Sequence, residues 1–428
     1  MTTERNWSTR HWSTRNRSTR RVALCACIVT LFTITGHPPS ALAAPPEDPS
    51  VKPFKINIDD SILEDLRGRL DRTRFPDQLD GVGWDYGTDL AYLKELVEYW
   101  RTQFDWRKQE RKLNEFPQFT TEIDGLEIHF IHARSKHENA LPLVLAHGWP
   151  DSVFGFQKVI GPLTDPEAHG GKAEDAFHVV CPSMAGYGFS AKPSERGWSV
   201  DRMGERAAKL MAKLGYTRYA AQGGDWGSGV VSWLGRNDGE HVAGIHLTLV
   251  GTPAPDDMAN PEDGIPEWEL KRTKDRRQWW NGENAYGNIQ GTKPQTLGYG
   301  LNDSPAGLAA WIIEKWRTWA DTKGDIESRF TKDELLTNVM IYWSTESIAS
   351  STRIYYESRR NVRDSGFVKV PAAVAIFPGE IFFSPRKWVE TAYNVKQWTE
   401  MPRGGHFAAM EEPELLVEDV RKFFRTVR

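Results

Sequence analysis

Apolar residues follow two different periods along the chain. From residue 141 onward, short apolar runs alternate with stretches of helical spacing, which is typical of a parallel sheet covered by helices. The predicted strands are 141–146, 177–181, 219–222, 246–250 and 372–377, and two of the predicted helices are 201–214 and 413–424. The alternation stops over residues 253–365, which are rich in tryptophan, charge and helical spacing. This segment predicts a helical lid inserted between two strands of the sheet.

The residues ahead of this sheet show a helical period of their own. One helix can begin at a cap on Asp59 or Asp60, and a second can begin at a cap on Thr88. Their apolar stripes are Ile62, Leu63, Leu66 and Leu70 in the first, and Leu90, Leu93, Val97, Trp100 and Phe104 in the second. An alternating run over 126–130 predicts a strand that closes this N-terminal helical extension.

The first 44 residues have the pattern of an export signal. An arginine-rich head with many Ser and Thr residues precedes an apolar stretch over about 22–35, and residues 18–21 resemble a twin-arginine signal. The apolar stretch is shorter than the roughly 20 residues that span a bilayer. Small residues around Ala43 would allow cleavage there. We therefore expect a secreted protein exported by the twin-arginine route, with a retained membrane anchor as the alternative.

These patterns predict an α/β fold with a mostly parallel sheet, a helical lid insertion and an N-terminal helical extension. The predicted parts are a signal peptide over 1–44, an N-terminal region over 45–135, a first part of the core over 136–252, the lid over 253–365 and a second part of the core over 366–428.

Charge and cysteine content narrow the function classes. Without residues 1–44 the chain carries 48 basic and 57 acidic residues, a balance that argues against nucleic-acid binding. Cys25 and Cys27 would leave with the signal, and Cys181 alone cannot form an internal disulfide. Export of an already folded chain would explain this composition. No cluster has metal-ligand spacing, so we expect neither a metal nor a cofactor. The oligomeric state stays open.

A candidate nucleophile follows the predicted strand 219–222. The sequence Gly223-Gly224-Asp225-Trp226-Gly227 has the G-x-Nu-x-G spacing of a nucleophile elbow, with Asp225 where hydrolases usually carry serine. Flanking glycines allow a tight turn that presents the central side chain at the edge of the sheet. A turn without chemical function is the alternative for this motif taken alone.

A candidate oxyanion loop follows the predicted strand 141–146. His147-Gly148-Trp149-Pro150 lies where this type of fold places such a loop. The backbone N–H groups of Trp149 and Trp226 would point at an oxygen that develops negative charge. We expect His147 itself to pack the loop.

Candidates for a base and its acid lie near the C-terminus. His406, in Arg403-Gly404-Gly405-His406-Phe407, precedes the last predicted helix and follows the chain order nucleophile, acid, base. Glu380 comes just after the strand 372–377, where the acid should lie, and it can orient the imidazole and stabilise its cation. Asp256 is the alternative acid.

An aspartate nucleophile restricts the reaction. A carboxylate attacks amides and esters poorly, but it can open a strained ring or displace a halide, giving an ester that activated water cleaves. Epoxide hydrolysis and haloalkane dehalogenation are therefore the two reactions considered, beside a non-catalytic binding protein. An epoxide oxygen needs a proton donor, and Tyr286 and Tyr355 in the lid can supply two phenols. Alternative phenols are Tyr299, Tyr342 and Tyr356.

From about residue 53 to its end, the chain resembles microsomal-type (juvenile-hormone-type) epoxide hydrolases. Besides the elbow and the His147 and His406 motifs, the resemblance rests on Leu301-Asn302-Asp303-Ser304-Pro305, Leu336-Thr337-Asn338-Val339-Met340 and Glu411-Glu412-Pro413-Glu414. It implies an α/β-hydrolase fold, a small-molecule epoxide substrate and an N-terminal region that wraps the core and braces the lid. The implied site residues are the nucleophile Asp225, the base His406, the acid Glu380 and the proton donors Tyr286 and Tyr355.

One departure from that family concerns the membrane. Microsomal-type members usually begin with a membrane anchor, whereas this chain begins with what resembles a cleavable signal. We therefore expect a soluble extracellular enzyme, and membrane association is not carried over from the family.

Overall fold

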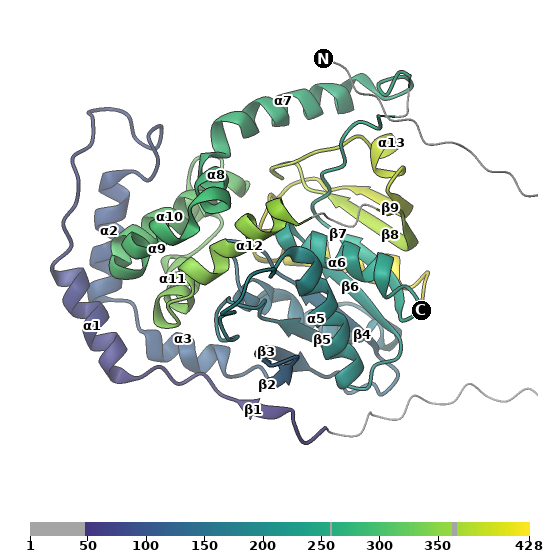
Figure 1. The fold of residues 1–428 in the computed structure, drawn as a ribbon, viewed down its shortest axis with the longest axis horizontal. Coiled ribbons are helices and arrows are strands. Elements are labelled where there is room, and N and C mark those ends of the chain that lie inside the picture. Colours follow the sequence, from purple (N-terminus) through teal and green to yellow (C-terminus); the bar gives the residue numbers. More distant parts are fainter. Residues whose placement is uncertain (1–47, 257–258, 362–365) are drawn as a thin grey trace, which may run out of the picture. The chain divides into compact units, whose positions relative to one another are not determined.

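The computed structural model describes residues 48–256, 259–361 and 366–428, so the predicted signal peptide lies outside the described residues. A nine-stranded sheet runs through this part of the chain in the order β1-β2-β3-β5-β4-β6-β7-β8-β9 (Figure 1). Pairing is antiparallel among β1, β2, β3 and β5 and parallel from β5 to β9. The strands are β1 (Lys52–Phe54), β2 (Gln118–Ile123), β3 (Leu126–Ala133), β4 (Leu141–Ala146), β5 (Phe177–Pro182), β6 (Tyr219–Gly223), β7 (Val242–Leu247), β8 (Val368–Ile376) and β9 (Tyr393–Glu400).

Helices cover both faces of the parallel part of the sheet. They are α4 (Gln157–Thr164), α5 (Val200–Lys213), α6 (Asp225–Asn237) and α15 (Pro413–Phe424). Leu143 and Leu145 of β4 share a hydrophobic cluster with α4 and α15, whereas Val144 shares another with α5 and α6. Every residue of β4 is buried, as expected for a parallel strand with apolar layers on both sides.

Five of the six parallel strands were predicted in the correct chain order, but the bounds of two are wrong. The strand predicted over 372–377 is β8, which begins four residues earlier, at Val368, and ends at Ile376. The strand predicted over 246–250 is β7, which runs from Val242 to Leu247. Leu247 pairs with Gly223, the last residue of β6, so the sheet ends there although the apolar pattern continues to Val250. The sequence pattern did not reveal β1, β2 or β9; β9, for example, has no fully buried residue.

The lid prediction agrees with the helical content between β7 and β8. This segment contains α7 (Glu267–Glu283), α8 (Ala285–Thr292), α9 (Pro294–Asp303), α10 (Pro305–Trp319), α11 (Lys332–Ser344) and α12 (Ile348–Arg360). α10 and α11 contribute many of the buried residues, because both helices are covered on one side by the core and on the other by the N-terminal helices.

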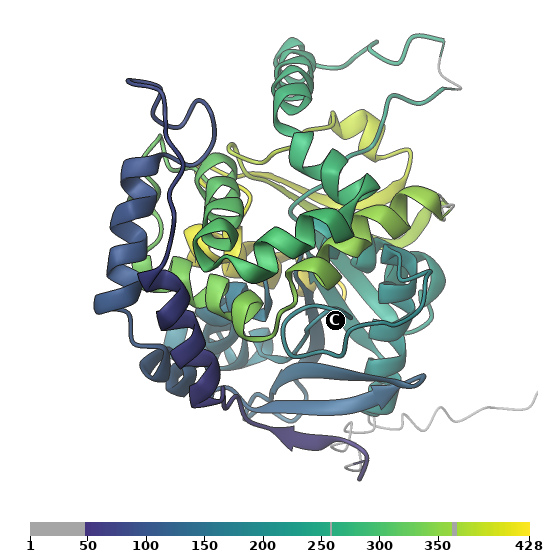
Figure 2. The ribbon, with the colours of Figure 1, turned by 60° about the vertical axis from the view of Figure 1, so that its left-hand side comes forward.

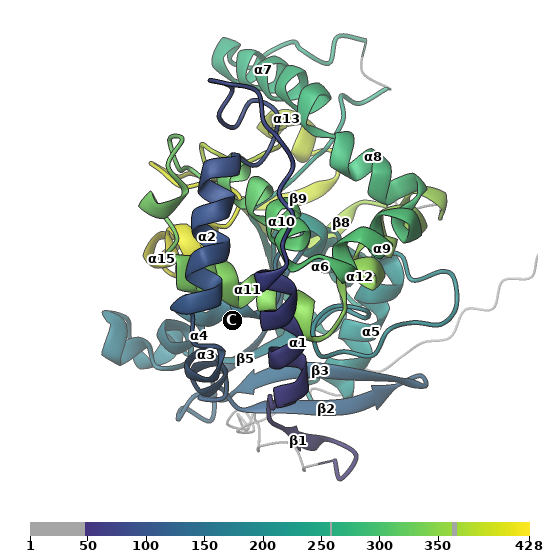
Figure 3. The same cartoon turned by 90° about the vertical axis from the view of Figure 1, so that its left-hand side faces the viewer.

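The N-terminal helices α1 (Asp60–Asp71), α2 (Leu90–Thr102) and α3 (Trp106–Leu113) pack against the lid, as Figures 2 and 3 show for α1 and α2. The Asp59 carboxylate caps α1 by accepting the Ser61 N–H. The predicted cap at Thr88 is wrong by one residue, because Asp89 caps α2. Thr88 instead donates its hydroxyl to the Ala310 carbonyl of α10, which ties the N-terminal region to the lid.

Short elements complete the described chain. They are the helices α13 (Arg386–Val389) and α14 (Ala408–Glu411) and the 3₁₀ turns η1 (Val153–Phe156), η2 (Pro166–His169), η3 (Ala173–Asp175) and η4 (Ile326–Ser328). None of the helices in the described ranges has both the length and the apolar character needed to cross a bilayer.

Candidate active site

Asp225 stands at a tight turn between the end of β6 and the start of α6. Its φ of 48° places a non-glycine residue in the left-handed region, which is strained. A Cβ atom added at Gly223 would overlap the Gly227 backbone, and one added at Gly227 would overlap the Ala146 carbonyl. Glycine is therefore required on both sides of Asp225, which is the geometry that the predicted elbow demands.

The loop after β4 reaches the Asp225 carboxylate. The Trp149 N–H donates a hydrogen bond of 2.8 Å to Oδ1 of Asp225. A Cβ atom added at Gly148 would overlap the same carboxylate, so glycine allows this close approach. Trp226 opens the first turn of α6 with its ring 4.8 Å from that of Tyr355. The function of its N–H as a second oxyanion donor stays a prediction.

His147 connects its own loop to the loop that follows β5. Its Nδ1 lies 3.0 Å from the Gly148 carbonyl, and its Nε2 accepts the Met184 N–H. Burial lowers the pKa of His147 to about 4, while the Gly148 hydrogen bond and the charge of Asp225 oppose this effect. The imidazole is therefore neutral, and both of its nitrogens have backbone partners, one in each of two loops, in keeping with the packing function expected for it.

His406 connects two carboxylates. Its Nδ1 lies 2.6 Å from Oε1 of Glu380, and its Nε2 lies 3.5 Å from Oδ2 of Asp225. Glu380 follows β8, and its Oε1 also accepts the Ile381 N–H. Burial lowers the pKa of His406, but the charges and hydrogen bonds of Glu380 and Asp225 outweigh burial and raise it to about 10. The imidazole is therefore cationic while both carboxylates are charged.

The structure brings the two predicted lid tyrosines together. The Tyr355 hydroxyl in α12 donates to the Tyr286 hydroxyl in α8 across 3.4 Å, and both side chains are buried. Burial raises the pKa of each phenol well above its usual value, so both keep their protons at neutral pH. The Trp149 ring stacks on Tyr286 at 5.4 Å and meets Tyr355 edge-on at 5.9 Å.

The alternative residues lie elsewhere or have other partners. Tyr299 is 71% exposed, and the Tyr342 hydroxyl donates to the Asp151 carbonyl. The Tyr356 ring lies under the Arg360 guanidinium at 3.4 Å. The position one residue earlier, Tyr355, is the one that contacts Trp149 and Tyr286. Likewise Glu380, not Asp256, accepts the hydrogen bond of His406.

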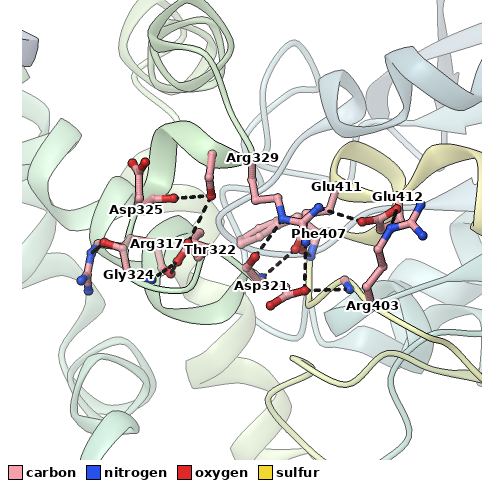
Figure 4. A network of polar contacts seen from close by, with 12 residues as sticks. Arg317, Asp321, Thr322, Gly324, Asp325, Arg329, Arg403, Phe407, Glu411 and Glu412 are labelled. Atoms are coloured by element: carbon pink, nitrogen blue, oxygen red, sulfur yellow. Dashed lines mark hydrogen bonds and ion pairs between the residues drawn. The ribbon is translucent and has the colours of Figure 1, made fainter.

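Sequence reasoning missed a polar network that holds the His406 loop, which Figure 4 shows. Arg329, between α10 and α11, forms ion pairs with Asp321 at 2.9 Å and with Glu412 at 2.7 Å. The Asp321 carboxylate also accepts the Gly404 N–H. The Asp321 carboxylate thus joins the lid to the C-terminal part of the core at Gly404, two residues before His406. The contacts between lid and core join residues that are 83 positions apart in the chain, so no local spacing could reveal them.

Three further hydrogen bonds fix the same loop. The His406 N–H donates to the Trp319 carbonyl at the end of α10. The buried Glu411 carboxylate accepts the N–H groups of Asp321 and Phe407. Burial raises the pKa of Glu411 to about 7, although both N–H groups lower it. The backbone of His406 is therefore bound directly to the lid.

This arrangement suits the opening of a strained ring rather than the release of a halide. A carboxylate on a strained turn has an N–H donor on one oxygen and an imidazole on the other. Two neutral phenols lie close to the loop that holds the carboxylate, and phenols can protonate an oxygen that leaves carbon. Halide release would instead rely on N–H donors alone.

Comparison with known proteins also indicates an epoxide hydrolase. Residues 51–156 match the family described as epoxide hydrolase N terminus, and residues 142–348 match the alpha/beta hydrolase fold. A protein of Stigmatella aurantiaca (strain DW4/3-1) is 48% identical over 384 residues, covering 88% of this chain and 86% of its own length.

Two relatives carry the family name. Epoxide hydrolase 1 of Sus scrofa is 40% identical over 417 residues, which cover 90% of this chain and 91% of the pig protein. The crystal structure of juvenile hormone epoxide hydrolase from the silkworm Bombyx mori matches with a TM-score of 0.82 and 34% identity, covering 89% of this chain and 95% of that one. The chain therefore belongs to the microsomal and juvenile-hormone epoxide hydrolases, which share the α/β-hydrolase fold.

Proposed function

We propose that this epoxide hydrolase converts its substrate to a vicinal diol through a covalent ester on Asp225. The observation that carries this proposal is the different surroundings of the two carboxylate oxygens. Oδ1 accepts the Trp149 N–H, whereas Oδ2 faces Nε2 of His406 at 3.5 Å. Oδ1 is thus placed to remain the carbonyl oxygen and to carry negative charge later, and Oδ2 is the attacking atom.

In the first step, Oδ2 of Asp225 attacks an epoxide carbon and the carbon–oxygen bond of the ring breaks. Tyr286 and Tyr355 both hydrogen-bond to the ring oxygen, and one of them gives it a proton, which yields a hydroxyalkyl ester. The resulting phenolate regains a proton as the imidazolium of His406 loses its own. The high pKa of both phenols supports this function, because a neutral phenol is a donor.

In the second step, His406 takes a proton from water, and the water oxygen attacks the ester carbon. This requires a neutral imidazole, whereas the free enzyme has a cationic one. Ester formation removes the Asp225 charge, which is one cause of the raised pKa of His406. The first step thereby lowers the pKa of the base that the second step needs. Glu380 orients the ring and stabilises its cation, and the Trp149 N–H, with Trp226 as the predicted second donor, binds the oxyanion.

Single-turnover mass spectrometry with styrene oxide in ¹⁸O-water tests this mechanism. We expect His406→Gln to accumulate a mass increase of one styrene oxide on the peptide that contains Asp225. We expect the wild-type enzyme to place ¹⁸O in the Asp225 carboxylate over repeated turnovers. Diol formation without adduct and without label on Asp225 would overturn the covalent mechanism.

We also propose that the enzyme acts outside the cytoplasm. The support is the sequence of residues 1–44, with its arginine pair at Arg20 and Arg21 followed by a short apolar stretch. In a bacterial host with a twin-arginine exporter, the full chain should appear beyond the inner membrane, with a new N-terminus near residue 44. Replacement of both arginines by lysine should keep it inside. Export that does not depend on the arginine pair would contradict this route.

A further inference from the structure

A small cavity lies against the nucleophile and the base. It has a volume of about 40 Å³, and Asp225, His406, Asp151, Phe156 and Met410 are among the residues that line it. Its lining includes neither Tyr286 nor Tyr355. A water molecule occupies roughly 10–15 Å³ on this measure of volume, so the cavity has room for a few waters.

Asp151 is an ionisable residue of this cavity that the two-step mechanism does not use. Its Oδ1 accepts the Ser152 N–H at 2.7 Å. A Cβ atom added at Gly155 would overlap the Asp151 carboxylate, so only glycine at position 155 leaves room for the Asp151 side chain. Burial raises the pKa of Asp151 to about 7, the Ser152 N–H and His406 lower it, and the charge of Asp225 raises it further. The ionisation of the Asp151 carboxyl group is therefore coupled to the charges of Asp225 and His406.

The lid fixes the backbone around Asp151. The Tyr342 hydroxyl donates to the Asp151 carbonyl at 2.6 Å, and the Asn338 amide donates to the Pro150 carbonyl at 2.7 Å. Both donors come from α11. Asp151 therefore has a fixed position two residues after Trp149, whose N–H binds Asp225.

We propose that this cavity holds the water that hydrolyses the Asp225 ester, and that Asp151 is the catalytic residue that orients this water. The proposal rests on the covalent mechanism described above. A water molecule has two hydrogens and needs two acceptors to be oriented. Nε2 of His406 accepts one hydrogen and the Asp151 carboxyl group accepts the other, so that a lone pair of the water oxygen points at the ester carbon.

The bonds and protons balance in this step. The water oxygen bonds to Cγ of Asp225 while its proton moves to Nε2 of His406. The tetrahedral intermediate then loses the bond between Cγ and the alkyl oxygen, and the leaving oxygen takes the proton from His406. The new Asp225 carboxylic acid gives its proton back to His406, which restores the charged pair of the free enzyme. Asp151 donates and accepts no proton overall; it only keeps its hydrogen bond to the water.

A structural function for Asp151 makes a different kinetic prediction. If Asp151 only shaped the loop that carries Trp149, its loss would disturb the Asp225 carboxylate and slow ester formation. If it orients the water, its loss slows hydrolysis alone. The two steps can be separated by rapid quenching and intact-protein mass spectrometry with styrene oxide, because the ester adds the mass of the substrate.

The variants are Asp151→Leu, which removes the polar group, and Asp151→Asn, which keeps the shape and one acceptor oxygen. We expect hydrolysis to slow about 10- to 100-fold in Asp151→Leu and less in Asp151→Asn, with the ester dominating at steady state. Ester formation should change by no more than about two-fold. Tyr286→Phe is the opposite control, because it should slow ester formation and leave no ester to accumulate.

Three outcomes decide the matter. A selective loss of hydrolysis supports the proposal, and equal loss in both steps, or no loss in either, overturns it. If Asp151→Leu does not fold, as judged by circular dichroism, the same criterion applies to Asp151→Asn. Failure of the underlying covalent mechanism is recognised separately, because His406→Gln would then show no ester either.

Discussion

Oε1 of Glu380 and Nδ1 of His406 lie 2.6 Å apart, and both side chains are buried. This contact selects Glu380 over Asp256 as the partner of the imidazole. We expect Glu380→Gln to lower turnover about 100-fold or more, because the neutral amide no longer stabilises the imidazolium. The turnover of each variant is measured as the steady-state rate of diol formation from styrene oxide. Asp256→Asn is the matched control and should keep wild-type turnover; the reverse ranking of the two variants would refute the assignment.

The charge coupling between Asp225 and His406 predicts a pH dependence. In the ester the Asp225 charge is gone, so His406 has a lower pKa than the value of about 10 in the free enzyme. Hydrolysis needs the neutral imidazole, so its rate should fall as pH is lowered through the pKa of the ester form. The steady-state ester fraction should therefore be larger at about pH 6 than at about pH 9. Quenched samples across this range give the fraction by mass spectrometry, and an ester fraction that rises with pH would contradict the coupling.

The two phenols should act in ester formation. Tyr286→Phe and Tyr355→Phe each remove one proton donor, and each should slow ester formation about 10- to 100-fold in single-turnover experiments. The double variant should be slower than either single variant. Tyr356→Phe is the neighbouring control, since its ring lies under Arg360, and it should stay within about two-fold of wild type. A larger effect at Tyr356 than at Tyr355 would reverse the assignment.

Arg329 should stabilise the folded chain through its two carboxylate partners. Arg329→Met leaves Asp321 and the buried Glu412 each without one ion-pair partner. Because Arg329 and Asp321 are partly exposed, we expect a loss of about 2 kcal/mol in the free energy of unfolding. Urea titration followed by circular dichroism measures it. Lys271→Met, which removes an exposed pair with Asp275, should cost less than about 0.5 kcal/mol. Equal effects of the two substitutions would mean that the network adds no stability.

The sequence predicted the fold class and the reaction, and both are confirmed by the comparisons with known epoxide hydrolases. The dehalogenase alternative is not favoured. Asp225 was recognisable because a strained turn needs glycines at fixed positions beside it. His406 was recognisable as the candidate base because it follows the candidate nucleophile and the candidate acid along the chain. The catalytic functions of these residues stay predictions until the variants above are measured.

Other features depended on contacts that no local pattern contains. Tyr355 and Tyr356 are adjacent in one helix and chemically identical, so only the packing against Trp149 distinguishes them. Thr88 and Asp89 are both good helix caps, and the Ala310 carbonyl decides the choice by binding the Thr88 hydroxyl. Asp151 follows directly after the His147 motif, yet its relation to His406 appears only when two distant loops meet around one cavity.

Trp149 contacts the nucleophile with its backbone and both phenols with its ring. The spacing between the attacking oxygen and the proton donors is therefore set within a single residue of the core, although the donors belong to the inserted lid. Lid helices distant from this ring can change during evolution without altering that spacing. Substrate range can thus diversify at the outer lid, and an engineered lid should preserve the two aromatic contacts of Trp149 to retain the ring-opening geometry.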